Sequence, residues 1–140
     1  MKSNWFELEI ESRLESLSVI SDFVAETTKQ LGVDLPTISR VQLAVDEACT
    51  NIIKHAYSEQ KGVITLTCEL VDDDLIITIR DRGKPFDPSS IPLPDLEADL
   101  NGRRVGGLGI YFMRKLMDEV SYNFDPERGN ELTMRKRLLK

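Results

Sequence analysis

The stretch DLPTISRVQLAVDEACTNIIKHAY, from Asp34 to Tyr57, carries the clearest pattern in this chain of 140 residues. Its apolar residues recur at the spacing of an amphipathic helix that buries one side. They are Ile38, Val41, Val45, Ala48, Ile52 and Ala56. Pro36 falls in the first turn, where its missing N–H is not needed. The stretch therefore predicts a helix that begins between Asp34 and Thr37.

The segments on either side predict strands and two further helices. Upstream, the alternating strand Phe6–Ile10 leads to a helix with apolar residues from Leu14 to Leu31, which Ser12 caps and Gly32 ends. Downstream, the patterns predict strands at Val63–Val71 and Leu75–Arg80 with a turn at Asp72–Asp74, a helix at Leu108–Val120, and strands at Val120–Phe124 and Glu131–Leu138 with a turn at Asp125–Asn130.

This order of elements predicts an α+β fold. We expect a two-layer α/β sandwich, in which a mostly antiparallel sheet is covered on one face by three helices. Short turns between consecutive strands favour antiparallel pairing, and helices gathered in blocks favour one helical layer. Residues 1–140 are expected to form a single domain, because domains usually have about 100–150 residues.

Composition narrows the classes of function. The chain is 41% hydrophobic and 30% charged, with a net charge of −6. This acidic balance argues against sequence-independent binding of nucleic acid, which requires a basic surface. The sequence shows neither an apolar run of membrane-spanning length nor an N-terminal stretch of signal-peptide type. Cys49 and Cys68 lack CxxC spacing, so they indicate buried thiols of a cytoplasmic protein.

Glu47 and Asn51 lie four positions apart and therefore neighbour each other on the predicted helix. Lys54 and His55 follow one turn later, close to the same face. Carboxylate and carboxamide oxygens are ligands suited to Mg²⁺, with water and phosphate completing the coordination. The alternative interpretation is a solvated helix edge, since Glu and Asn at this spacing are common.

The sequence Asp81-Arg82-Gly83 follows the predicted strand Leu75–Arg80. An Asp followed by Gly at a strand end is usually just a turn. In the functional interpretation, a buried carboxylate accepts a hydrogen bond from an exocyclic amine, and the glycine lets a flat base approach the backbone. Such a pocket rejects a base that lacks the amine.

A long proline-containing stretch from Gly83 to Val105 precedes the glycine cluster Gly106-Gly107-Leu108-Gly109. A loop of this length inside a compact domain is often a functional lid. The cluster opens a helix, whose free N–H groups favour an anion, and Arg103 and Arg104 stand immediately before it. A phosphate cradle and a simple hinge with a helix cap are both consistent with this pattern. Neither GxxxxGKS nor a GxGxxG after a parallel strand is present.

Taken in order, these motifs resemble the GHKL ATP-binding superfamily, which includes gyrase, histidine kinases and the large heat-shock chaperone. Within it the chain is most similar to the RsbW-type anti-sigma-factor serine/threonine protein kinases of bacteria. The resemblance runs from about Phe6 to Leu138. It rests on Glu47–Tyr57, on Asp81-Arg82-Gly83, and on Gly107-Leu108-Gly109-Ile110 leading to Leu116-Met117-Asp118.

The resemblance implies a Bergerat fold with an ATP lid at about residues 83–106, and the cofactors ATP and Mg²⁺. It implies that Glu47 is the general base and that Asn51 coordinates Mg²⁺. Asp81 is implied to bind the adenine amine, with Gly83 beside the base. The full set of ATP-binding residues that it implies is Asn51, His55, Asp81, Gly83, Arg104, Gly106, Gly107, Leu108 and Gly109.

Two features depart from the family pattern. Lys84-Pro85-Phe86-Asp87-Pro88 stands where the family often has a second glycine. Many relatives also open the last strand with Gly-Thr, with the threonine near the base, whereas this chain has Gly129-Asn130. The resemblance therefore does not carry the threonine's contact to this chain.

For the function, the resemblance implies an ATP-dependent serine protein kinase that phosphorylates an anti-anti-sigma (STAS) protein and can sequester a sigma factor. The alternative is a non-catalytic, nucleotide-dependent switch that regulates a phosphatase or signalling complex, although retention of Glu47 favours the kinase. A histidine kinase is disfavoured, because the only histidine, His55, lies in the nucleotide-binding helix. A homodimer through Trp5 and Phe6 is a further possibility, the alternative being that Trp5 covers the core.

Overall fold

The computed structural model describes residues 4–56, 62–83 and 113–138. Their elements are β1 (Trp5–Glu11), α1 (Ser16–Gln30), α2 (Leu35–Asn51), the π-helix η1 (Ile52–Ala56), β2 (Val63–Val71), β3 (Asp74–Asp81), β4 (Glu119–Asp125) and β5 (Gly129–Arg137). The strands form one sheet in the order β1-β2-β3-β5-β4, and every neighbouring pair is antiparallel.

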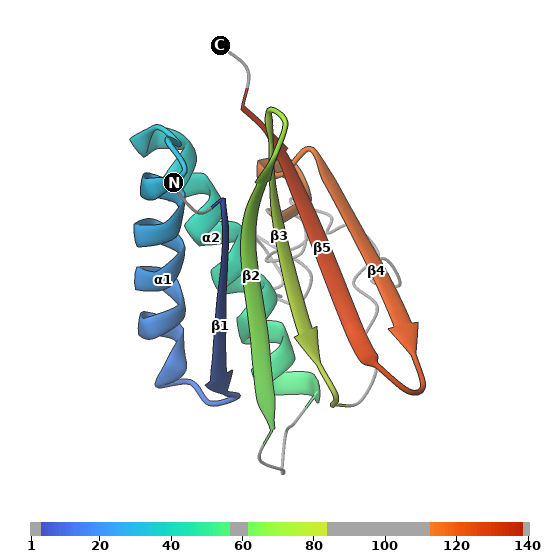
Figure 1. The fold of residues 1–140 in the computed structure, drawn as a ribbon. Helices are drawn as coiled ribbons and strands as arrows, with labels where there is room; N and C mark the ends of the chain where they lie inside the picture. The colour runs from blue at the N-terminus through green and yellow to red at the C-terminus, as the bar shows by residue number, and fades with distance from the viewer. Residues whose placement is uncertain (1–3, 57–61, 84–112, 139–140) are drawn as a thin grey trace, which may run out of the picture.

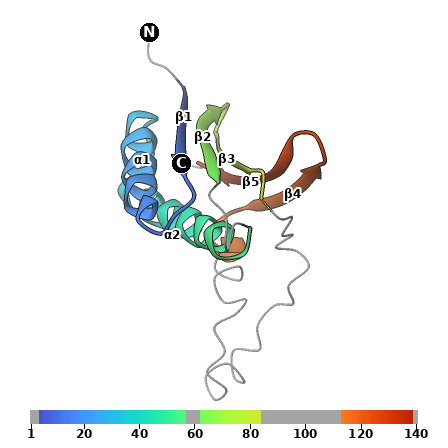
Figure 2. The same ribbon diagram turned by 90° about the horizontal axis from the view of Figure 1, so that it is seen from below.

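The helices lie on one face of this sheet, so the predicted two-layer α+β sandwich is confirmed (Figures 1 and 2). The core between the layers combines the apolar stripe of α2 with alternate residues of β2, β3 and β5. A third helical segment, at residues 113–116, adds the buried Met113 to this core. The other face of the sheet carries no helix among the described residues (Figure 2).

Alternation along β3 determines where its last side chain points. Leu75, Ile77 and Ile79 are fully buried against the helices. Side chains two positions apart share one face of a strand, so Asp81 points to the helix side. Arg80 points to the open face and is exposed.

The start of α2 follows the sequence pattern. Asp34 is the N-cap, and its Oδ1 accepts a hydrogen bond from the Thr37 N–H at 3.1 Å. This bond satisfies one of the unpaired donors of the first turn. Pro36 occupies that turn, as predicted.

The predicted start of α1 is wrong, whereas its predicted end is confirmed. The helix begins at Ser16, and the Ser12 side chain caps nothing, since its buried Oγ has no hydrogen-bond partner. The chain first makes a turn in which the Ser16 hydroxyl donates to the Glu11 carbonyl oxygen at 2.7 Å. Gly32 ends the segment with φ at +88°, a conformation that favours glycine.

Two other helix ends differ from the prediction. The α-helix that was expected to reach Ala56 becomes a π-helix at Ile52, and the third helix stops at residue 116 because β4 begins at Glu119. A π-helical segment widens the turn and is frequent at functional sites.

In the β2–β3 hairpin, Asp72 takes a positive φ of 55°, and Asp74 already belongs to β3.

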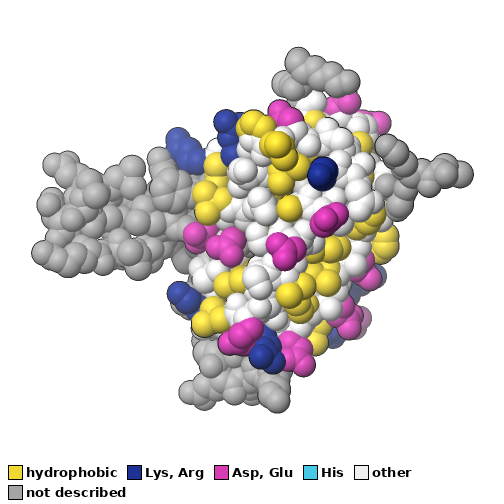
Figure 3. Space-filling model, turned by 90° about the vertical axis from the view of Figure 1, so that its left-hand side faces the viewer, with side chains coloured by type: hydrophobic (Ala, Val, Ile, Leu, Met, Phe, Trp, Pro, Cys, Tyr) yellow, Lys and Arg dark blue, Asp and Glu magenta, His cyan; other side chains and the backbone are white. Residues whose placement is uncertain are grey.

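Both cysteines are free and buried, which confirms the prediction of buried thiols. Burial raises the pKa of the Cys49 thiol to about 12 and that of Cys68 to about 11. None of the helices in the described ranges has the length and hydropathy to cross a membrane. Figure 3 shows the side of the molecule formed by α1 and the edge strand β1, where hydrophobic side chains are interspersed with acidic ones.

Two glycines with positive φ give a matched test of the fold. We expect Gly32→Ala to lower the free energy of unfolding by about 1 kcal/mol, the cost of a side chain in this region of φ. Gly129→Ala should cost about 3 kcal/mol, because overpacking is added to that strain. A Cβ at Gly129 would lie 2.5 Å from the Asp81 carbonyl oxygen, whereas one at Gly32 meets nothing within 4 Å. Equal losses in urea unfolding would contradict this difference.

Candidate functional site

The C-terminal end of β3 and the C-terminal half of α2 meet at one end of the molecule (Figures 1 and 2). The charge of Asp81 reaches the Cys49 thiol on α2 and contributes, after burial and Asp46, to raising its pKa. Two of the predicted site segments are therefore neighbours in the fold, although Glu47 and Asp81 are 34 positions apart in the sequence.

Asp81 is a buried carboxylate, only 6% exposed. Its Oδ1 accepts hydrogen bonds from the Gly83 N–H and from Asn130 Nδ2, both at 2.9 Å. Its Oδ2 accepts none from residues that the structure describes. Burial raises the pKa of the Asp81 carboxyl, and these two donors act in the opposite direction because they stabilise the charged form.

Asn130 is a site residue whose role the sequence analysis did not find. It is 3% exposed and pairs with Asp81 in the register of β3 and β5. Its Nδ2 also donates to the Gly83 carbonyl oxygen at 3.0 Å, while its Oδ1 accepts from the Tyr122 hydroxyl at 2.7 Å. The one available signal was that Gly129-Asn130 replaces the family's Gly-Thr.

Gly129 brings the two strands close together beside Asp81. A Cβ at this position would lie 2.5 Å from the Asp81 carbonyl oxygen and 3.1 Å from Cγ of Arg82. Only glycine leaves room for this approach, so Gly129 supports the geometry of Asp81 although it carries no side chain.

Glu47 and Asn51 are both half-buried and lie one turn apart at the border of the buried stripe of α2. The pKa of the Glu47 carboxyl is raised by burial and next by the negative charge of Asp46, against the effect of Lys54. A carboxylate whose pKa moves toward neutrality becomes a better general base.

The remaining predicted site residues are described in part or not at all. His55 lies in η1, where the structure describes its backbone. Gly83 follows β3 and donates its N–H to Asp81. Arg103, Arg104, Gly106, Gly107, Leu108, Gly109 and the rest of the predicted lid beyond Gly83 lie outside the described residues.

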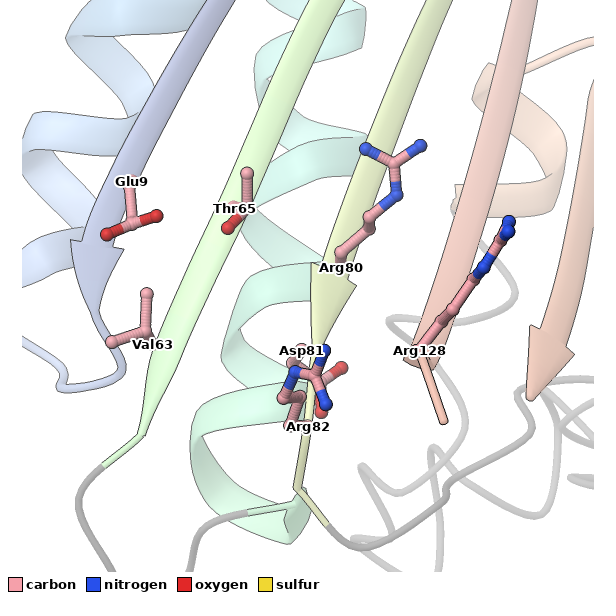
Figure 4. A pocket seen from close by; sticks show the side chains of 7 residues that line it. All are labelled: Glu9, Val63, Thr65, Arg80, Asp81, Arg82 and Arg128. Atoms are coloured by element: carbon pink, nitrogen blue, oxygen red, sulfur yellow. The ribbon is translucent and has the colours of Figure 1, made fainter. Parts of the chain in front are cut away.

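A separate cavity of about 360 Å³ opens at the same end of the sheet (Figure 4). It is lined by Glu9, Val63, Thr65, Arg80, Asp81, Arg82 and Arg128. Arg80 pairs with Glu131 at 2.8 Å on the open face, where an exposed ion pair contributes less than about 1 kcal/mol. Glu47 and Asn51 do not line this cavity, and Asp81 is the residue that the cavity shares with the place where α2 meets β3.

Comparison with known proteins agrees with this arrangement. Residues 10–136 match the model of the histidine kinase-like ATPase domain. The chain belongs to this family. It is 32% identical over 145 residues to the serine-protein kinase RsbW of Staphylococcus aureus, covering 99% of this chain and 90% of the relative. RsbW of S. aureus strain MRSA252 gives the same identity and coverage.

A solved structure shares the fold. The crystal structure of the RsbU and RsbW domains of a Mycobacterium tuberculosis protein superposes with a TM-score of 0.69 at 17% identity. The match covers 96% of this chain and 32% of that one, so this chain spans about a third of its length. At this identity the likeness concerns the fold alone. The histidine kinase-like ATPase fold that the motifs implied is thus confirmed.

The raised pKa of Asp81 predicts a specific dependence of stability on pH. A carboxyl with a higher pKa in the folded state binds protons more tightly when folded, so its contribution to stability falls as pH rises between the unfolded and folded pKa values. We expect the stability of wild type to fall relative to that of Asp81→Asn as pH rises from the unfolded-state pKa of the carboxyl through its raised folded-state pKa. Urea unfolding of both proteins at each pH measures this difference. The contributions of the other carboxylates are the same in the two proteins and therefore cancel in the comparison. A relative gain by wild type would contradict the raised pKa.

Proposed function

We propose that this chain is an ATP-dependent serine protein kinase of the RsbW type. The observation that carries the proposal is the buried carboxylate of Asp81, which lies near Cys49 in the C-terminal half of α2, the part of the helix that also carries Glu47 and Asn51. Family membership implies the use of ATP, and near full-length similarity to serine-protein kinases supports the transfer of phosphate to a serine.

In this proposal Asp81 recognises the adenine. Its Oδ1 is occupied by donors of the protein, so Oδ2 accepts the hydrogen bond from the exocyclic amine of the base. Gly83, without a side chain, lets the ring lie against the backbone. We assign the phosphates to Arg104, Gly106, Gly107, Leu108 and Gly109, and the nucleotide end of α2 to His55.

Asn51 fits a magnesium ligand by its chemistry, because Mg²⁺ takes few protein oxygens and completes its octahedron with water and phosphate. Asn51 is half-buried at the end of α2. In the proposed role Asn51 holds the ion, which neutralises phosphate charge. Glu47, one turn earlier, is positioned to accept the proton of the attacking serine hydroxyl, and burial favours its function as a base.

The proposed partner is an anti-anti-sigma (STAS) protein that carries the phosphorylated serine, with a sigma factor as the alternative partner in partner switching. This activity takes place in the cytoplasm, where sigma factors act. We also propose a homodimer through the edge strand β1, where the 48% exposure of Trp5 leaves apolar surface for a contact with a second copy.

Titration calorimetry tests the nucleotide site. We expect Asp81→Asn to weaken ADP binding about tenfold or more, because the acceptor that pairs with the amine is no longer charged. Asn51→Ala should abolish the dependence of ATP affinity on Mg²⁺ while leaving adenine recognition in place. Asn123→Ala, at an exposed asparagine of β4, is the matched control and should change neither. Unaltered ADP binding by Asp81→Asn would remove the basis of the proposal.

Phosphate transfer is tested with labelled ATP and a candidate STAS protein encoded beside this chain. Glu47→Gln should lower the transfer rate about 100-fold or more, with nucleotide affinity changed less than about twofold. Glu26→Gln, at an exposed position of α1, is the matched control. If nucleotide binds but no partner is labelled, and partner binding is the same in Glu47→Ala, the non-catalytic switch is the correct function.

A further inference from the structure

We propose that Asn130, held by Tyr122, is a positioning residue that keeps Asp81 a hydrogen-bond acceptor and thereby selects 6-aminopurines over 6-oxopurines. This inference rests on the proposed nucleotide site at Asp81. It assigns a role to a residue at which this chain departs from its family's sequence pattern.

The orientation of the Asn130 amide follows from its three hydrogen bonds. Nδ2 donates to Asp81 Oδ1 at 2.9 Å and to the Gly83 carbonyl at 3.0 Å, and Oδ1 accepts from the Tyr122 hydroxyl at 2.7 Å. With the amide reversed, its oxygen would face two acceptors. Because both groups facing Nδ2 are acceptors, this buried network has one satisfactory arrangement.

This arrangement determines which oxygen of Asp81 can carry a proton. Oδ1 receives the Gly83 N–H and the Asn130 amide, so any proton must reside on Oδ2. An ionised Oδ2 accepts from a 6-amino group and repels the carbonyl oxygen of a 6-oxopurine. A protonated Oδ2 instead donates to the carbonyl oxygen of a 6-oxopurine and no longer favours the 6-amino group.

Asn130 influences the choice between these two states. Burial favours the protonated carboxyl, and the Asn130 donor is the first of the two groups that oppose it. If this donor is removed, the Gly83 N–H is the group left to oppose the effect of burial on the pKa of the Asp81 carboxyl. The side chain on β5 therefore shifts the protonation of a carboxyl on β3 toward the charged form and, through it, the base that the site accepts toward the 6-aminopurine.

Threonine and valine at position 130 form a nearly isosteric pair with and without a donor, and both suit a strand. We expect Asn130→Thr to keep most of the discrimination, since its hydroxyl supplies a donor to Asp81. Asn130→Val should reduce the ADP-to-IDP affinity ratio about tenfold or more near neutral pH. Asn130→Val should also raise the pH below which ADP affinity declines, because the Asp81 carboxyl then takes up its proton at a higher pH. Tyr122→Phe should shift both quantities in the same direction by less, because it frees the amide without removing it.

The measurements are calorimetric titration with ADP and IDP across pH, and ¹³C NMR titration of the Asp81 carboxyl without nucleotide. Asn123→Val, at an exposed position of β4, is the control for the substitution itself. A higher Asp81 pKa in Asn130→Val, but not in Asn130→Thr, supports the proposal. The same ADP-to-IDP ratio and the same carboxyl pKa in the Thr and Val variants would overturn it and leave Asn130 a purely structural link.

The two readouts separate this inference from the proposed function. If wild type binds no ADP, the proposed nucleotide site fails and purine selection fails with it. If wild type binds ADP and both nucleotides weaken equally in Asn130→Val, with no change of the carboxyl pKa, the nucleotide site stands and the role of Asn130 is wrong.

Discussion

The hydrogen bonds that hold the Asp81 carboxylate in a buried place are the constraint on which this end of the molecule depends. A buried charge is unfavourable unless donors compensate it. Here the donors come from the backbone just after β3 and from a side chain of β5. The β3–β5 register and the glycine at 129 are both required for that second donor to reach its acceptor.

Helix α2 packs its apolar stripe against the sheet and carries polar residues beside that stripe, at the same end of the molecule as Asp81. Its apolar stripe fixes it against the sheet, so Glu47 and Asn51 at the border of that stripe have a defined position without being fully buried. A functional side chain on a packed helix is placed more firmly than one on a loop. The π-helical segment η1 that follows has a wider turn than a continuous α-helix.

The sequence predicted the features that local physics determines. The cap at Asp34, the β2–β3 hairpin and the burial alternation of β3 depend on residues within a few positions of one another. It failed where distant parts of the chain compete with local preference. Ser12 was expected to cap a helix, but its backbone N–H instead donates to the carbonyl oxygen of Gly62, just before β2, and the helix begins four residues later. The role of Asn130 required the register of two strands 49 residues apart, which no local pattern encodes.

That separation in sequence also affects how the protein is made. During synthesis, Asp81 leaves the ribosome well before Asn130, and by then α1, α2 and the first three strands are already available to pair. Until β5 arrives, the outer edge of β3 has no neighbouring strand and the carboxylate lacks its side-chain donor. A nascent chain that stops short of the last hairpin would contain both long helices and most of the apolar core, yet the Asp81 carboxylate would still lack the donor that β5 supplies.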